Sequence, residues 1–190
     1  MGSRSEADAL DFRQAVAYVK GIVPEDDASP VVKVADDCAP VMRKLCEGLL
    51  VAYLVEEGRY FRYVQGHHLK EAGITRAELD ELAIENLRST ARGRVVVDSY
   101  GPVMTARLDG NLEAGLLLLD EFWDVAMRDH VGSSPIVAVP SRDVIAFCSG
   151  DSAAGRAELR AVISRVWSGG DHLVSDSLLS RRDGRWSPVR

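Results

Sequence analysis

Two pairs of adjacent residues carry the side chains of this sequence that are best suited to chemistry. His67 and His68 follow one another in a loop before an expected helix, and adjacent imidazoles can supply one metal ligand and one general base. Arg142 and Asp143 lie in a turn between two expected strands, where the Arg could bind an anion and the Asp could orient it or act as a base. One hypothesis is therefore a hydrolase or metal-dependent enzyme that uses these two loops.

The same residues also have purely structural interpretations. Loop histidines are commonly solvated, and a turn aspartate commonly accepts hydrogen bonds from its own backbone. The sequence has no second group of ligands at metal-like spacing, no G-x-S-x-G nucleophile elbow and no glycine-rich phosphate loop. Its three cysteines, Cys38, Cys46 and Cys148, form no CxxC pair. The sequence therefore favours a protein that is not an enzyme and that holds no metal or cofactor.

A different kind of site is expected on an acidic segment. Apolar residues at helical spacing predict a helix from about residue 112 to residue 130, with a stripe formed by Leu116, Leu119, Trp123 and Met127. The plain interpretation is a core helix with a solvated acidic side. The alternative is a docking surface, because Trp and close charge pairs are typical of binding hot spots. We call this the predicted partner surface: Asp120, Glu121, Trp123 and Asp124.

The charge balance narrows the class of partner. The chain has 29 acidic and 23 basic residues, a formal net charge of −6 and a pI near 5.3. Such a chain lacks the basic footprint of a general nucleic-acid binder. A cluster of Arg181, Arg182, Arg185 and Arg190 around Trp186 could contact an anion or RNA, but a basic hairpin with no such role is the stronger interpretation. A protein partner with a basic surface is the expected one.

The elements that position these residues are predicted to be β-hairpins that alternate with helices. Hairpins begin near residues 49, 94, 135 and 173, and helices follow near Thr75, at 112–130 and at 152–167. Thr75 and Glu78 form a T-x-x-E capping box. This order predicts an α+β fold with antiparallel sheet, made of three ββα units and a terminal ββ. We expect residues 1–30 to form a helix over 5–20 and a polar loop, a short strand at 31–34, and one α+β domain over 31–190.

Several spaced motifs in residues 60–190 resemble the YtpQ-like bacterial family of unknown function. They include FRYV at 61–64, AIENLR at 83–88, DGNLEAGLL at 109–117, VAVPSRDV at 137–144 and DGRWSPV at 183–189. The N-terminal third of the chain matches the family poorly. The resemblance implies the fold of that family and a bacterial, cytosolic origin, but no activity.

Compartment and function follow from these patterns. The longest unbroken apolar run is the seven residues 49–55, far short of the roughly 20 residues that span a membrane. No secretion signal is visible, and three unpaired thiols suit a reducing compartment. We therefore expect a cytoplasmic, non-enzymatic protein-binding domain, with an immunity or antitoxin-like inhibitor of a basic partner as one concrete form. The oligomeric state is left open.

Overall fold

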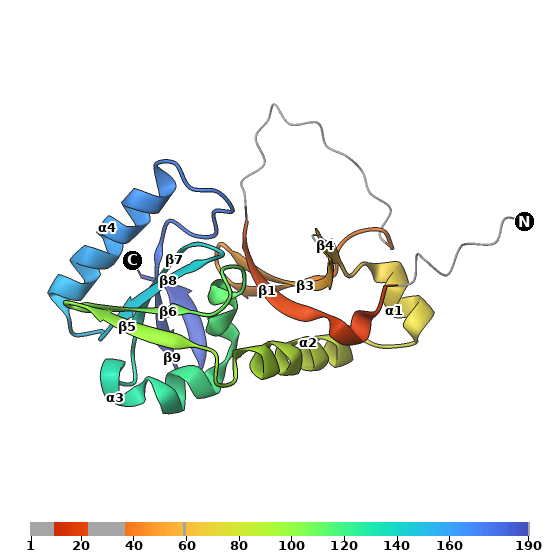
Figure 1. The fold of residues 1–190 in the computed structure, drawn as a ribbon, viewed down its shortest axis with the longest axis horizontal. Helices are drawn as coiled ribbons and strands as arrows, with labels where there is room; N and C mark the ends of the chain where they lie inside the picture. Colours follow the sequence, from red (N-terminus) through yellow and green to blue (C-terminus); the bar gives the residue numbers. More distant parts are fainter. Residues whose placement is uncertain (1–9, 23–36, 59, 190) are drawn as a thin grey trace, which may run out of the picture.

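Two antiparallel sheets lie side by side, with helices packed against them (Figure 1). The computed structural model describes residues 10–22, 37–58 and 60–189. A single cluster of buried side chains runs from the first sheet into the second, so the two sheets share one core. The predicted α+β class and the single compact domain are confirmed.

The first sheet has four strands in the order β1-β3-β2, with β4 also paired to β3. Its strands are β1 (Val16–Gly21), β2 (Met42–Cys46), β3 (Leu49–Glu57) and β4 (Tyr60–Tyr63). β3 is the centre of the sheet because β1 and β2 flank its first half and β4 pairs with its second half. The predicted hairpin that begins near residue 49 is therefore confirmed.

The N-terminal helix expected over residues 5–20 is wrong where the structure describes it. A short 3-10 helix, η2 (Phe12–Gln14), leads directly into β1. Every residue of β1 pairs with β3, and Ala17, Val19 and Gly21 are buried in strand alternation. Pairing with a strand 30 residues away thus overrides the local helical pattern. The expected loop at 23–30 and strand at 31–34 lie outside the described residues.

Helix α2 (Arg76–Ala91) follows the short helix α1 (Gly66–Ala72) and starts at the predicted capping box. The Thr75 hydroxyl accepts from the Glu78 amide at 3.2 Å, and the Glu78 carboxylate accepts from the Thr75 amide at 2.7 Å. The helix then buries the face formed by Leu79, Ala83, Leu87 and Ala91. These residues recur every four positions, so α2 packs one continuous stripe against β1.

The second sheet has six strands in the order β10-β9-β7-β8-β6-β5. Its strands are β5 (Val96–Tyr100), β6 (Val103–Arg107), β7 (Ile136–Ser141), β8 (Val144–Cys148), β9 (Leu178–Arg182) and β10 (Arg185–Pro188). Helix α4 (Ala153–Trp167) packs on one face, where Ile136 and Ala138 point. The alternate residues Val137 and Val139 join the larger core on the other face. The three predicted hairpins and the helix at 152–167 are confirmed.

The single helix expected over 112–130 is wrong. The segment divides into a 3-10 helix, η3 (Glu113–Leu118), a π-helix, η4 (Phe122–Ala126), and a short α-helix, α3 (Arg128–Val131). The Trp123 indole donates to the Leu116 carbonyl at 2.8 Å, and the Trp186 indole donates to the Leu117 carbonyl at 2.8 Å. A continuous α-helix would need both carbonyls for its own amides four residues on. The tryptophans therefore satisfy the backbone where the helix breaks.

Among the described residues, no helix is both long enough and apolar enough to cross a lipid bilayer.

Candidate functional site

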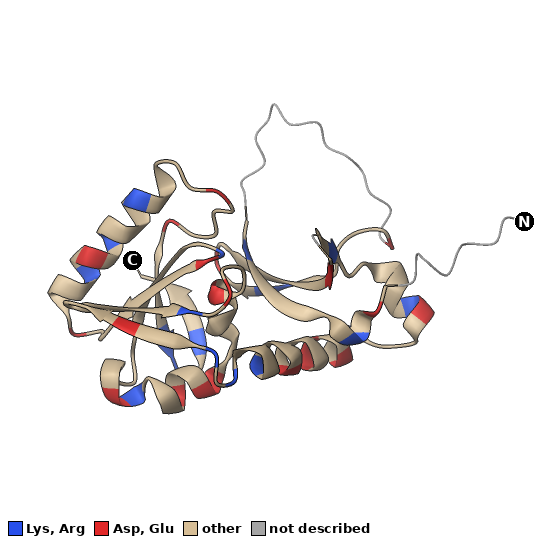
Figure 2. Cartoon of the chain, viewed as in Figure 1, with Lys and Arg blue, Asp and Glu red and all other residues tan. Residues whose placement is uncertain are grey.

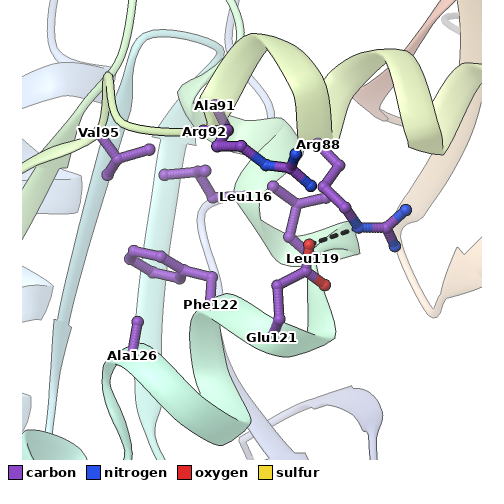
Figure 3. Close-up of a pocket in the computed structure, with 9 residues that line it drawn as sticks. All are labelled: Arg88, Ala91, Arg92, Val95, Leu116, Leu119, Glu121, Phe122 and Ala126. Atoms are coloured by element: carbon purple, nitrogen blue, oxygen red, sulfur yellow. Dashed lines mark hydrogen bonds and ion pairs between the residues drawn. The ribbon is translucent and has the colours of Figure 1, made fainter.

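An open groove lies between the C-terminal end of α2 and the η3–η4 segment (Figure 3). Its volume is about 520 Å³, within the usual range of ligand-binding recesses. We call it the α2–η4 groove and define it by its lining residues: Arg88, Ala91, Arg92, Val95, Leu116, Leu119, Glu121, Phe122 and Ala126.

Local backbone structure explains why the floor of the groove is apolar. On α2 the helical spacing places Ala91 beside Arg88 on the side that faces η4, and Arg92 follows directly after the end of the helix. On the other wall, Leu119 ends η3 in an extended conformation, so the chain turns before η4 begins. Figure 3 shows Phe122 directed into the space between the two walls. The floor is thus formed by side chains of two elements that do not pack fully against each other.

Charged groups occupy the rim of the α2–η4 groove. Arg88 Nε donates to Glu121 Oε1 at 2.5 Å, and Arg88 also pairs with Glu85 one turn earlier on α2. The hydrogen bond to Glu121 is the main cause that raises the pKa of Arg88. Arg92 reaches the same rim (Figure 3). Glu121, a member of the predicted partner surface, therefore lines a recess, although an arginine of the same chain already binds it.

Asp120 and Asp124, also of the predicted partner surface, bind a buried arginine. Arg181 on β9 is 3 % exposed and donates to Asp120 Oδ1 and to Asp124 Oδ1, each at 2.5 Å. Burial lowers the pKa of Arg181, but the hydrogen bonds to Asp124 and Asp120 outweigh it and raise the pKa. These two carboxylates therefore hold η4 against the second sheet, while their outer sides stay exposed to solvent.

Trp123 does not lie on the surface, so its place in the predicted partner surface is wrong. It is 1 % exposed, and its ring packs edge-on against Phe122, Phe147 and Trp186 at centroid distances of 4.9, 5.3 and 5.1 Å. The break in the helix turns this indole into the core instead of toward solvent. Phe122, next to it in the chain, is the aromatic residue that reaches the groove.

The net charge of the protein is concentrated on the two elements that border the groove (Figure 2). Helix α2 and residues 112–131 together carry nine acidic and three basic residues. The remaining chain carries 20 acidic and 20 basic residues, because the totals are 29 and 23. An apolar recess therefore lies between the two segments whose excess acidic charge equals that of the whole chain.

His67 and His68 lie in the first turn of α1 and not in a loop as predicted, and both have structural contacts there. The His67 amide donates to the Asp37 carbonyl at 2.7 Å, and its Nδ1 lies 3.0 Å from the same oxygen. His68 Nδ1 accepts from the Gln65 amide at 2.9 Å, which completes a capping box. Within the described parts of the chain, no three His, Cys, Asp or Glu side chains are grouped as metal ligands.

Arg142 and Asp143 lie at the β7–β8 turn, as predicted, and far from α1 (Figure 1). The Arg142 amide donates to the His172 carbonyl at 3.2 Å, and its carbonyl accepts from the Ala114 amide at 3.0 Å. Asp143 Oδ1 accepts from the Ser141 hydroxyl at 2.6 Å. The structure therefore does not bring this pair together with the two histidines, and the enzyme hypothesis has no shared site in the described residues.

Two charged residues, Glu113 and Arg181, are buried, which the sequence did not predict. Glu113, 2 % exposed, accepts hydrogen bonds from the amides of Leu108, Asp109 and Gly110 at 2.8, 3.1 and 2.8 Å. Arg181 belongs to the basic cluster expected on the last hairpin, but its burial removes it from any surface for anions or RNA. An acidic residue three positions after a Gly turn is the only sequence signal for Glu113.

Comparisons of the chain with protein-family models, with curated proteins and with solved structures found no match. The resemblance to the YtpQ-like family therefore stays a prediction.

Proposed function

We propose that this protein is a non-enzymatic protein-binding domain whose α2–η4 groove takes a basic segment of a partner protein. The observation that carries the proposal is the location of the net charge on the two elements that border an apolar recess. Excess acidic charge around a site attracts a basic partner and speeds its encounter. An apolar floor then supplies the desolvated contact on which most binding energy depends.

The chemistry of the expected segment follows from the lining. One or two apolar side chains would contact Leu119 and Phe122, and a flanking Lys or Arg would lie near Glu121. Glu81 and Glu85 are exposed on α2, seven residues before Arg88 and Arg92, so they share a helix face with the rim. A basic amphipathic segment satisfies both features at once.

An immunity or antitoxin-like inhibitor of a basic protein is the concrete form that we propose. The supporting feature is the acidic charge of the two segments that border the groove. In this form, the groove would cover a basic surface that the partner needs for its own activity.

A direct test uses a defined probe and a matched pair of variants. Ala126→Trp fills the groove, whereas Val125→Trp adds the same ring at a neighbouring position, 75 % exposed and not among the lining residues. The probe is a fluorescein-labelled amphipathic peptide made of leucine and lysine. Its control peptide has glutamate in place of every lysine. We expect anisotropy to show binding of the lysine peptide to the native protein and to Val125→Trp, with at least tenfold weaker binding to Ala126→Trp.

Two results would contradict the proposal. Equal binding to Ala126→Trp and Val125→Trp would place the contact outside the groove. Equal binding of the glutamate peptide would remove the role of the acidic border. Thermal unfolding of both variants near the native midpoint establishes that a loss of binding is not a loss of fold.

A further inference from the structure

A second recess lies where the two sheets meet, and its chemistry is opposite to that of the groove. This junction cavity has a volume of about 250 Å³. Five elements supply its walls, namely strands β1, β3 and β4, the β7–β8 turn, and the loop after α4. The polar groups among the lining residues are Tyr18, Lys20, Tyr63, Arg142 and His172.

These polar groups are all able to donate hydrogen bonds, and none of the described lining residues is acidic. Tyr18 and Lys20 are two residues apart on β1, so they share one face of the strand. Lys20 Nζ donates to the Tyr63 hydroxyl at 3.1 Å and lies 5.3 Å from the centre of that ring. Burial raises the pKa of Tyr18, although Arg142 opposes the shift, so the Tyr18 hydroxyl keeps its proton at neutral pH.

The backbone around the cavity is held closely in place. Arg142 is hydrogen-bonded through both its amide and its carbonyl, as described above. His172 adopts a left-handed conformation with φ 52°, and the Asp171 carboxylate accepts from its amide at 2.8 Å. Gly21 lets this loop approach β1 (Figure 1), because a Cβ there would lie 2.1 Å from the Val174 carbonyl oxygen. A non-glycine residue with positive φ costs conformational energy, and such residues cluster at functional sites.

We propose that the junction cavity binds a phosphate group, either free or as the monoester of a small molecule. A phosphate dianion needs two positive charges and several donors around three oxygens. Lys20 and Arg142 supply the charges, while Tyr18, Tyr63 and His172 supply further donors. A carboxylate would use only part of this set, since it has one negative charge and two oxygens. This inference is independent of the α2–η4 groove.

Two carboxylates lie next to the donors but are not among the residues that line the junction cavity. Asp143 and Asp171 line an adjoining cavity that shares Arg142 and His172 with this one. Asp143 accepts from the Ser141 hydroxyl, and Asp171 Oδ2 lies 3.4 Å from His172 Nε2, with the Asp171 side chain 90 % exposed. Solvent screens the Asp171 carboxylate, so Lys20 and Arg142 remain the main charges that face an anion in the cavity.

The test measures the binding of three defined anions to the full chain by isothermal titration calorimetry. The probes are inorganic phosphate, phenyl phosphate and benzoate. We expect both phosphates to bind and benzoate to bind at least tenfold more weakly. Arg142→Gln and Lys20→Gln should each weaken phosphate binding by on the order of tenfold, because each removes one charge-assisted hydrogen bond. Arg182→Gln, at an exposed position of β9, is the matched control and should bind as the native protein does.

Each outcome either tests the proposal or identifies the form of phosphate that the cavity binds. Phenyl phosphate binding that is tighter than that of free phosphate assigns the site to a monoester, and equal binding assigns it to the free anion. No phosphate binding at millimolar concentration, benzoate binding as tight as phosphate, or unchanged binding in Arg142→Gln would overturn the proposal. The Arg142 backbone bonds do not need its side chain, so a thermal midpoint near the native value will show that Arg142→Gln is folded.

Discussion

The α2–η4 groove and the junction cavity have opposite chemistry within one small domain. The groove has an apolar floor and a rim of Arg88, Arg92 and Glu121, and it lies between two segments that together carry nine acidic and three basic residues. The cavity is smaller, lined by five hydrogen-bond donors, and has no acidic residue among its described lining. A net charge of −6 therefore says nothing about the charge at a given recess. The chemistry of each site follows from which segments the fold brings together.

The two recesses also differ in how they are built. Segments of one region, residues 88–126, form the whole groove, whereas the cavity takes residues from position 18 to position 174. We therefore expect the groove to depend on how the η3–η4 segment is attached, and the cavity to depend on the junction of the sheets. Four substitutions follow, beginning with the largest expected effect. Three of them test that difference, and Tyr53→Phe tests a buried group outside both recesses.

Trp123→Ala should cost about 3–5 kcal/mol of unfolding free energy, since it removes a fully buried indole. This change also removes the 2.8 Å hydrogen bond from the indole to the Leu116 carbonyl, which then accepts only from the Leu119 amide at 3.3 Å. Urea denaturation measures the loss, with Val125→Ala as a control at a 75 % exposed position. If Trp123→Ala keeps the native stability but no longer binds the lysine peptide, Trp123 contacts the partner and the interpretation as a core residue is wrong.

Arg181→Met should cost on the order of 2–3 kcal/mol, because it removes the charge-assisted hydrogen bonds through which the buried guanidinium holds Asp120 and Asp124 against β9. We expect the loss of these hydrogen bonds to change the groove more than the cavity. Thermal unfolding measures the stability, and phosphate titration of the folded variant measures the cavity. Arg182→Met, one residue along the same strand and exposed, should change stability by less than about 0.5 kcal/mol.

Tyr53→Phe should remove part of the alkaline destabilisation of the protein. Burial, with the 2.8 Å hydrogen bond to Asp80, raises the pKa of Tyr53 above its ordinary value of 10.0. Stability from such a group is complete below pH 10 and is lost as the pH rises toward the folded-state pKa, since the unfolded chain ionises first. The thermal midpoint of the native protein should therefore fall between pH 10 and 11. The fall should be shallower in Tyr53→Phe, and identical slopes would contradict this.

Arg88→Gln should have the smallest effect on stability, below about 1 kcal/mol, because its ion pairs with Glu85 and Glu121 are solvent-exposed. Its effect on the groove should be larger, since it makes the border more acidic. We expect tighter binding of the lysine peptide at low salt and little change at high salt. Weaker binding would show that Arg88 itself contacts the peptide.

Local signals predicted much of this fold. The capping box of Thr75 and Glu78 marks the start of α2, and turn residues mark the hairpins of the second sheet. β2 and α1 were not predicted, and two further elements were assigned the wrong structure because distant residues decide them. β1 is a strand since it pairs with β3, and the segment 112–131 is broken since Trp186 takes a carbonyl 69 residues away.

The candidate sites were less predictable than the fold. Glu121 does line the groove, and Arg142 does line the cavity. Trp123 was assigned to the wrong side of its segment, because Phe122 and Val125 near it are also apolar and hide which face is buried. Lys20, Tyr63 and His172 have no common spacing in the sequence, so only tertiary structure brings them to Arg142.

The balance of 20 acidic and 20 basic residues outside α2 and residues 112–131 has a consequence for how the molecule moves toward a partner. A net charge carried by one edge gives the protein an electric dipole in addition to its charge. In the field of a cationic surface, such a molecule rotates as it approaches and arrives with that edge leading. Orientation before contact would raise the association rate at low ionic strength, while the dissociation rate would depend on the apolar floor.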